Sequence, residues 1–405
     1  MTVKDHLKYA GPGSTPSFNR PQDSPSVHLD ALRGFAALSV MLSHWRGACF
    51  SEFSNYSIRN PVLSVCNFFA GLGHQWVIVF FVLSGYLVGG SVLRSMDSGR
   101  WSWRGYLTSR LTRLYVVLLP ALLLGGAIDW AGMHMARTGY VYNSSGAEHV
   151  LYREGHYTLT LPTMVANGLF LQNIALPGRG GERVTTFGSN GVLWSLSNEF
   201  WYYIAFPLLV LALANSRSWA ARAGYGVALV VLGWFIGLWM VIMGIPWLMG
   251  VILHYLPPLR ARGALKRSAW IALAMLMLVG ALVLGFVWNS LMSDLILGVI
   301  VTFLIWVILN CTASRLPSGY IRIAQRSARS SYTLYLVHVP FLVFLKAYLH
   351  LPNSISGWPK FAVSIALLVA VLLYAQLVYQ LFERNTDGVR AWINGYPANR
   401  QAAKA

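Results

Sequence analysis

Long apolar runs separated by short polar connections extend over most of the chain. Most of the runs are close to the ~20 residues that an α-helix needs to cross the hydrocarbon core of a bilayer. They predict membrane-spanning helices at 30–50, 66–93, 107–128, 191–214, 223–243, 245–257, 269–288, 292–312, 331–350 and 359–382. The run at 245–257 is short, so we expect a helix that is tilted or partly buried. The predicted fold class is an all-α polytopic membrane protein with about ten transmembrane helices.

Composition supports this class. The 405 residues are 56% hydrophobic and only 11% charged, whereas about a quarter of the residues in a soluble domain are charged. Three cysteines, Cys49, Cys66 and Cys311, are too scattered for a metal cluster or a disulfide framework. Cys49 and Cys66 flank one short loop and could form a bridge, although buried thiols are the better interpretation.

Basic residues indicate the orientation, because cytoplasmic loops of membrane proteins are enriched in Lys and Arg. The short apolar run 159–176 is interrupted by Pro162 and Asn167. If it does not cross the membrane, most Lys and Arg residues and both termini lie on the cytoplasmic side. If it did cross, the later basic clusters would face outward. We therefore interpret it as a re-entrant or surface element of an outer segment, 129–190.

The net charge of +18 follows largely from this topology. Contact with anionic lipid accounts for it, and it gives no reason to predict nucleic-acid binding. Residues 1–27 are polar and show no cleavable signal, so we expect a disordered cytoplasmic tail. A membrane domain over 28–386 and a second cytoplasmic tail over 387–405 follow. The predicted location is the bacterial cytoplasmic (inner) membrane.

Ionisable residues inside the spans are costly in lipid and are therefore candidates for function. Arg33 and His44 are eleven residues apart, which places them on one face of the first helix. Asp30 precedes Arg33 by nearly one turn and could orient it. His44 is a candidate general base, because an imidazole titrates near neutral pH. The alternative is a histidine that anchors the helix end beside Trp45.

Glu199 is the acidic residue that lies deepest within a predicted span. An unpaired buried carboxylate would cost several kcal/mol, so it needs a partner, a proton or a function. Pairing with a buried arginine is the structural alternative. A polar and aromatic mouth precedes it on the outer side and is a candidate substrate pocket, formed by Trp194, Ser195, Ser197 and Asn198.

Three further groups of residues complete the candidate set. Arg110 and Arg113 lie on one helix face at the cytoplasmic end of the third span, where they could bind phosphate or simply orient the helix. Ser84 precedes Gly85 in a pattern that favours close helix packing more than nucleophilic chemistry. Tyr332, Tyr335 and His338 share a helix face of the ninth span, and interfacial anchoring would also explain the tyrosines.

These segments together resemble the acyltransferase-3 family of integral membrane acyltransferases. The matching strings occur in the family's order between residues 28 and 386: LDALRGFAALSVMLSHW, FFVLSGYL, YLTSRLTRLYVVLLP, LWSLSNEFWYY, SSYTLYLVHVP and LVYQLFERN. Two positions depart from the family pattern. Asn198 precedes the acidic residue, and Asn385 stands where the closing element usually has proline. The resemblance is to the stand-alone form, without an added hydrolase-like domain.

The resemblance implies a membrane-bound O-acyltransferase that acylates a cell-surface or secreted carbohydrate. Acyl-CoA is the implied co-substrate, a carbohydrate or glycolipid is the acceptor, and no metal or tightly bound cofactor is expected. By residue, Arg33 and His44 match the family's essential first-helix pair, and Arg110 and Arg113 match its donor-binding RxxR element. Glu199 matches its acidic position, and His338 matches the histidine of its SYxLYLxHxP element.

The expected mechanism places the donor phosphates on Arg110 and Arg113 while His44 deprotonates the acceptor hydroxyl. Glu199 would hold His44 in one tautomer or orient the acceptor. A covalent acyl-His44 relay would use the same residues. A transporter of a sugar, lipid or polysaccharide precursor and a purely structural scaffold are the rival classes, since both could contain the same buried polar groups.

Overall fold

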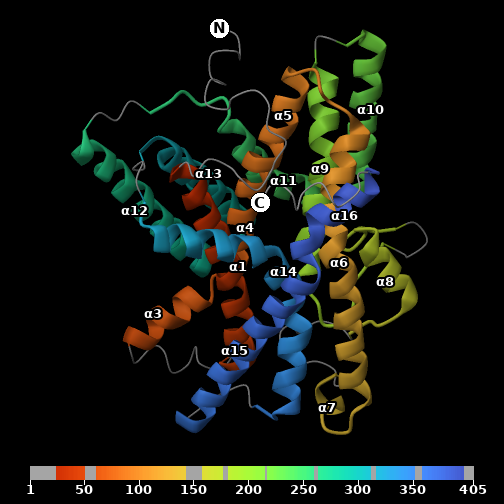
Figure 1. Ribbon diagram of the computed structural model, residues 1–405, viewed down its shortest axis with the longest axis vertical. Helices are drawn as coiled ribbons and strands as arrows, with labels where there is room; N and C mark the ends of the chain where they lie inside the picture. The colour runs from red at the N-terminus through yellow and green to blue at the C-terminus, as the bar shows by residue number, and fades with distance from the viewer. Residues whose placement is uncertain are drawn as a thin grey trace.

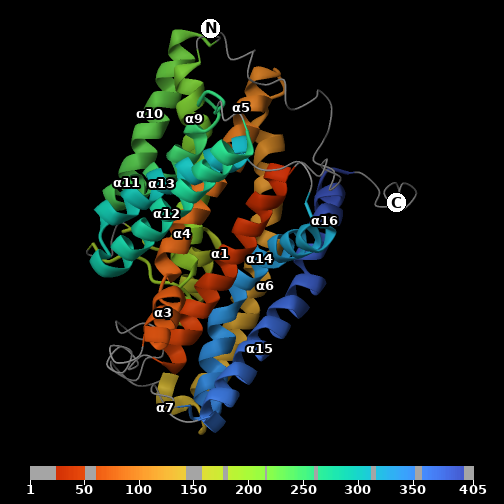
Figure 2. The ribbon, with the colours of Figure 1, turned by 90° about the vertical axis from the view of Figure 1, so that its left-hand side faces the viewer.

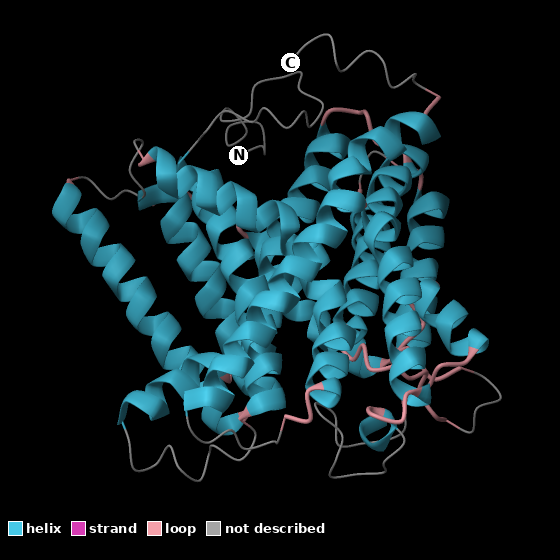
Figure 3. Cartoon of the chain, turned by 60° about the horizontal axis from the view of Figure 1, so that its bottom comes forward, coloured by secondary structure: helices cyan, strands magenta, loops and turns pink. Residues whose placement is uncertain are grey.

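The computed structural model describes residues 24–50, 61–142, 157–176, 181–214, 217–259, 263–311, 316–351 and 358–395. Within these ranges the chain consists of helices and connecting loops, without a β-strand (Figure 3). A single antiparallel bridge joins Ala175 and Arg183. The predicted all-α class is confirmed.

Eight helical segments of the described chain are long and apolar enough to cross a membrane. Helices α4 (Gly73–Ser84) and α5 (Gly90–Asp97) form one of them through the π-helix η3 (Gly85–Gly89). The others contain α6 (Trp103–His134), α9 (Leu193–Leu213), α10 (Trp219–Ile236), α12 (Ala264–Trp288), α13 (Leu291–Cys311), α14 (Ser318–Tyr348) and α15 (Trp358–Leu381). Two further helices match predicted spans, the polar α1 (Ser24–Cys49) and the shorter α11 (Leu238–Ile252).

Short helices complete the described chain. They are α3 (Pro61–Ala70), α7 (Gly139–Tyr142), α8 (Leu161–Gly168), the 3-10 turn η4 (Glu383–Asn385) and α16 (Thr386–Ile393). In Figure 1, α5 and α10 reach the upper end of the bundle and α7 lies at the lower end, and in Figure 2 both α3 and α7 lie at the lower end. The upper end corresponds to the predicted cytoplasmic side and the lower end to the predicted outer side.

Helix α1 lies inside the bundle, packed along α14 and against α4. Its buried residues recur every four positions, with Ala36 above Val40 and Ala37 above Met41, which is the period of a helix face in contact with neighbours. Few residues in the most apolar parts of α10 and α12, by contrast, are buried. The polar residues of α1 are therefore surrounded by protein instead of lipid.

Helices α4 and α11 approach so closely that only glycine fits at the crossing. A Cβ atom on Gly85 would lie 1.8 Å from the carbonyl oxygen of Trp247, and one on Gly250 would lie 2.0 Å from that of Val82. The prediction that the Ser84-Gly85 pair allows close helix packing is thus confirmed for Gly85. The π-helical turn at Gly85–Gly89 starts at this contact, and such turns are frequent at functional sites.

Two predicted boundaries are wrong. The run 66–93 contains two helices, because α3 ends at Ala70 and α4 starts at Gly73. The break between the predicted spans 223–243 and 245–257 lies at Gly237 and not near residue 244. Gly237 has φ +82°, a backbone conformation that favours glycine and ends α10, whereas Gly244 lies inside α11 against the ring of Tyr202.

The run 159–176 forms only the eight-residue helix α8, followed by a loop. At 1.5 Å per residue, α8 extends about 12 Å, far less than the ~30 Å of a hydrocarbon core. Polar bonds hold the loop that follows: Asn167 donates its side-chain amide to the carbonyls of Thr163 and Thr185 and accepts from the backbone N–H of Phe187.

The tail and cysteine predictions fall partly on described residues. Helix α1 starts at Ser24, so the end of the predicted tail 1–27 is helical, and α16 forms the start of the predicted tail 387–405. The remainder of both tails lies outside the described residues. Cys49 and Cys311 are buried free thiols, as the favoured interpretation predicted. The side chain of Cys66 also lies outside the described residues.

Candidate active site

Two histidines from opposite ends of the chain meet at the interface of α1 and α14. The Nδ1 atom of His44 lies 2.8 Å from Nε2 of His338, and the two rings are stacked with centroids 5.0 Å apart. His338 is completely buried. The side chain of His44 therefore points into the bundle and not toward lipid. Both residues were predicted as site candidates, but their contact was not predicted.

The hydrogen bonds of this pair determine its tautomers. Nδ1 of His338 lies 2.8 Å from the backbone carbonyl of Leu334, which can only accept, so this nitrogen carries a proton. Nε2 of a neutral His338 is then an acceptor, and Nδ1 of His44 must donate to it. The proton of a neutral His44 is thus on Nδ1, and its Nε2 atom is the basic nitrogen.

Arg33 lies about three turns before His44 on α1, at its predicted cytoplasmic end. Its guanidinium is 3.1 Å from the carboxylate of Asp30, which confirms that Asp30 orients it. Arg33 and Arg113 both lie within electrostatic range of Glu383, in the turn after α15. Glu383 in turn accepts hydrogen bonds from the backbone N–H and the hydroxyl of Thr333, at 3.1 and 2.5 Å.

The two candidate arginines of α6, Arg110 and Arg113, differ in their surroundings. Arg110 donates to the hydroxyl of Ser91 at 2.9 Å, and its guanidinium lies about 6 Å from the ring centroids of Tyr106 and Tyr203. Arg113 is exposed. A half-buried guanidinium between two aromatic rings is suited to hold a phosphate, because its planar fork keeps a fixed orientation.

Glu199 belongs to a second polar cluster, formed by α4, α9 and α11. Its carboxylate accepts hydrogen bonds from the hydroxyls of Ser84, at 2.9 Å, and Tyr203. The indole N–H of Trp247 donates to Ser84 at 3.1 Å. Because Tyr203 also contacts Arg110, this cluster is adjacent to the arginine region. His338, and not Glu199, therefore holds the tautomer of His44.

Tyr335 lies between the histidine pair and the mouth formed by the start of α9. Its hydroxyl is 2.6 Å from that of Ser195, and its ring centroid is 6.4 Å from that of His338. Tyr332, one turn earlier, donates to the carbonyl of Leu114 at 3.3 Å. Tyr335, which was predicted to share a helix face with Tyr332 and His338, thus links two elements of the site.

The other mouth residues separate into structural and accessible positions. Ser197 is fully buried and donates to the carbonyl of Phe170 at 2.6 Å, so it holds the outer segment against α9. Asn198 is also fully buried. Trp194 is half-buried at the start of α9, and its ring is stacked at 6.1 Å on that of His74. Of the four predicted mouth residues, only Trp194 is half-buried, and the other three are buried.

Two residues of the site, Tyr203 and Glu383, were not among the predicted candidates. Glu383 follows the last span directly and is acidic, which is a usable signal. Tyr203 shows no signal of its own among the other aromatic residues of the spans. Within the described residues no group of three or more His, Cys, Asp or Glu side chains is arranged to hold a metal ion.

Fold and site define a polytopic membrane protein with ionisable residues buried between its central helices. Comparison with known families identifies it further. A family model described as an acyltransferase domain, that of the acyltransferase-3 family, matches residues 27–379. The chain belongs to this family, and the resemblance noted in the sequence is confirmed. No solved structure matches the chain.

Three curated relatives show the same relationship at low identity. Acyltransferase MdmB of Streptomyces mycarofaciens is 28% identical over 50% of this chain and 44% of its own length. Nodulation protein 10 of Rhizobium leguminosarum bv. viciae is 28% identical over 51% of the chain and 49% of its own length. An O-acetyl transferase of Shigella phage Sf6 is 24% identical over 51% and 52%. The chain spans about half the length of these relatives.

Proposed function

We propose that this protein transfers an acyl group, with acetyl as the first candidate, from acyl-CoA to a hydroxyl of a cell-surface or secreted carbohydrate. It would do so from the bacterial cytoplasmic membrane, with a carbohydrate or glycolipid as acceptor. Membership of the acyltransferase-3 family supports acyl transfer and disfavours the transporter and scaffold alternatives. The O-acetyl transferase among the relatives supports acetyl and a hydroxyl acceptor.

The observation that carries the proposal is the hydrogen-bonded pair of His44 and His338. The acceptor hydroxyl oxygen attacks the thioester carbonyl carbon, and its proton moves to Nε2 of His44. The C–S bond then breaks, and the CoA thiolate takes the proton from His44. The products are an ester and CoA. His338 acts as a positioning residue, because its Nε2 atom accepts from the imidazolium that forms on His44.

The donor is held by the arginines. Arg110 and Arg113, with Arg33, would bind the phosphates of acyl-CoA at the predicted cytoplasmic end, where arginine can form bidentate bonds. Glu199 is adjacent to this region through Tyr203. We propose that Glu199 positions Ser84 and Tyr203 beside the acyl chain and balances the charge of Arg110. Holding donor and acceptor together in this way converts a bimolecular step into a local one.

The test is acyl transfer by His44→Ala protein in membranes, followed with radiolabelled acetyl-CoA. We expect incorporation of label into the glycan fraction to fall at least ~100-fold, the usual contribution of a general base. His134→Ala is the matched control, because His134 is exposed at the end of α6 and bonds only to the backbone of Trp130 among the described residues. Full activity of His44→Ala would exclude His44 as the base. Accumulation of unmodified substrate without an acylated product would instead favour a transporter.

A further inference from the structure

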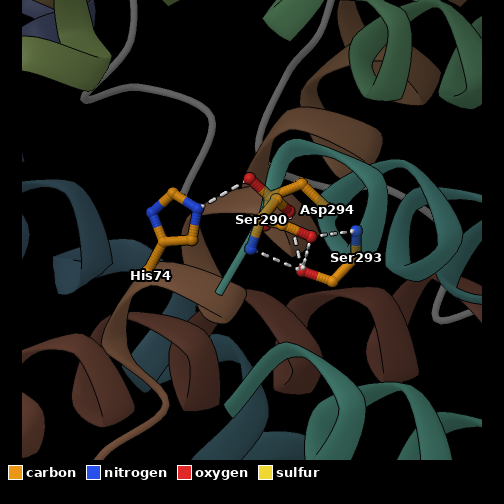
Figure 4. A network of polar contacts seen from close by, with 4 residues as sticks. All are labelled: His74, Ser290, Ser293 and Asp294. Atoms are coloured by element: carbon orange, nitrogen blue, oxygen red, sulfur yellow. Dashed lines mark hydrogen bonds and ion pairs between the residues drawn. The ribbon is translucent and has the colours of Figure 1, made fainter. Parts of the chain in front are cut away.

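A second ionisable pair lies at the end of the bundle where α4, α9, α11 and α13 all begin. The Nε2 atom of His74, on α4, is 2.9 Å from a carboxylate oxygen of Asp294, on α13 (Figure 4). Helix α4 follows directly on α3, which lies at the same end of the bundle as α7 (Figure 2). This end corresponds to the predicted outer side. We call His74, Asp294, Trp194 and Trp239 the outer cluster.

Two indole rings extend the outer cluster beside the imidazole. The ring of Trp194 is nearly parallel to that of His74, at 17° and 6.1 Å between centroids. The ring of Trp239, at the start of α11, is 5.8 Å from that of Trp194. Trp239 is 38% exposed, and the side chain of His74 is 36% exposed. A ligand can therefore reach both the indole faces and the imidazole.

The helix end fixes Asp294 and, through it, His74. Ser290 and Ser293 bond to each other's backbone N–H groups, at 3.3 and 3.0 Å, and close the first turn of α13 (Figure 4). The Asp294 carboxylate is only 9% exposed and lies in this first turn, where the helix dipole favours a negative charge. Because an ionised carboxylate can only accept, Nε2 of His74 donates to it. Nδ1 of a neutral His74 is then an acceptor for a ligand hydroxyl.

We propose that the outer cluster is the binding site for the carbohydrate acceptor. A sugar ring offers an apolar C–H face and a rim of hydroxyl groups. Indole rings can stack on the C–H face. An imidazole that is oriented by a carboxylate can form hydrogen bonds with the hydroxyl groups. This assignment rests on the proposed function, because that function makes a carbohydrate the acceptor.

The outer cluster is also connected to the histidine pair. Trp194 is followed by Ser195, whose hydroxyl is 2.6 Å from that of Tyr335, and the Tyr335 ring lies against His338. A sugar bound on Trp194 is thus held at the start of α9, which contacts Tyr335 beside the histidine pair. The outer cluster selects and holds the acceptor, while His44 acts on its hydroxyl.

Binding of methyl pyranosides to the full-length protein in detergent tests this assignment. The probes are the methyl glycosides of glucose, galactose, mannose, rhamnose and N-acetylglucosamine, observed by saturation-transfer NMR. We expect at least one of them to bind. Trp239→Ala removes stacking, and His74→Phe keeps a ring beside Trp194 but removes the hydrogen bonds. Each should weaken binding about tenfold, the size expected for one lost aromatic contact in Trp239→Ala and for one lost hydrogen bond in His74→Phe.

Two control variants show whether a loss of sugar binding comes from the outer cluster itself, from misfolding or from a loss of acyl transfer. Trp234→Ala removes an 82% exposed tryptophan of α10, and it should bind the sugar like the wild type. His44→Ala should also bind normally while failing to transfer the acyl group. The thermal unfolding midpoint of each variant is measured in parallel. If either Trp239→Ala or His74→Phe is unfolded, its loss of binding is set aside and the other variant tests the site.

The outcomes for the outer cluster and for the proposed function are distinct. If no pyranoside binds, or if Trp239→Ala and His74→Phe bind it with wild-type affinity, the outer cluster is not an acceptor site, even where acyl transfer occurs. If these variants lose sugar binding but the wild type transfers no acetyl group to any glycan, the acceptor site stands and the proposed reaction fails. In an active enzyme, the same two variants should raise the acceptor KM with little change in kcat.

Discussion

Helices α14 and α10 are both classed as apolar spans, yet their environments differ completely. In the most apolar part of α14, 67% of the residues are buried, against 11% in α10. The buried helix contains Tyr335, His338 and Lys346, whereas the exposed residues of α10 include Val230 and Trp234. Two helices that are both apolar enough to cross a membrane thus have opposite positions in the bundle.

The difference has a simple physical origin. A polar side chain that faces lipid costs several kcal/mol, and the cost is recovered only when protein groups replace water as partners. His338 has two such partners, the Leu334 carbonyl and His44. Helices whose ionisable residues lie within the apolar layer must therefore lie at the centre of the bundle, as α1 does beside α14 and α4.

The largest expected effect comes from the close contact between α4 and α11. Gly85→Ala would place a Cβ atom 1.8 Å from the Trp247 carbonyl oxygen, a backbone overlap that only movement of the helices can relieve. We expect most of the folded protein to be lost, as measured by its yield in a monodisperse peak on size-exclusion chromatography. Gly226→Ala on α10 is the matched control, because the corresponding Cβ would meet nothing within 4 Å. Equal yields of the two variants would show that the buried crossing of α4 and α11 tolerates a side chain as well as the exposed helix α10 does.

The next effect concerns the buried histidine of α14. His338→Ala removes the acceptor that fixes the His44 tautomer, and kcat should fall about a hundredfold while the KM for acetyl-CoA changes little, as for other bases that lose their orienting group. Steady-state kinetics in proteoliposomes measure both constants. A larger change in KM than in kcat would mean that His338 contacts the donor instead.

A smaller effect is expected at the arginine region. Arg110→Ala with Arg113→Ala should raise the KM for acetyl-CoA about tenfold or more, because each charge-assisted hydrogen bond contributes roughly 1.5–3 kcal/mol. Arg104→Ala is the control, since Arg104 is an exposed arginine of the first turn of α6. Unchanged donor affinity in the double variant would assign these arginines to membrane orientation alone.

Stability should respond to the buried carboxylate of α6. Asp129 accepts from the backbone N–H and the hydroxyl of Ser189, at 2.7 and 2.8 Å, and so ties the loop before α9 to α6. Asp129→Ala leaves a buried donor without its acceptor, which costs about 1–3 kcal/mol. The midpoint of thermal unfolding should fall, whereas Asp97→Ala, at an exposed position, should leave it unchanged. An unchanged midpoint for Asp129→Ala would mean that this loop is held by other contacts.

The smallest effect is expected for an exposed residue of α10. Val230 is 72% exposed, so Val230→Ala removes little packing, and its effect on stability should stay within about 0.5 kcal/mol. The unfolding midpoint and the acyl-transfer rate check this. A marked loss would show that this face of α10 packs against another protein surface.

Much of the fold was predictable because the bilayer requires long apolar helices. The spans, the short α11 and the orientation of Arg33 by Asp30 followed from run length and from spacing within a helix. Helix breaks were harder, because Gly237 and Gly244 look alike in sequence and differ only in the backbone conformation that packing imposes. The site residues were found one by one, as ionisable groups in apolar surroundings.

The partners of these groups depended on the tertiary structure. By itself the sequence determined that His44, Glu199 and His338 are embedded in apolar helices, since the cost of polar groups in lipid is a local property. Only the packing of α1 against α14 decided that His44 is paired with His338, 294 positions away, and that Glu199 bonds to Ser84 and Tyr203. Helical periodicity specifies which residues share a face, but it carries no information on which other helix that face meets.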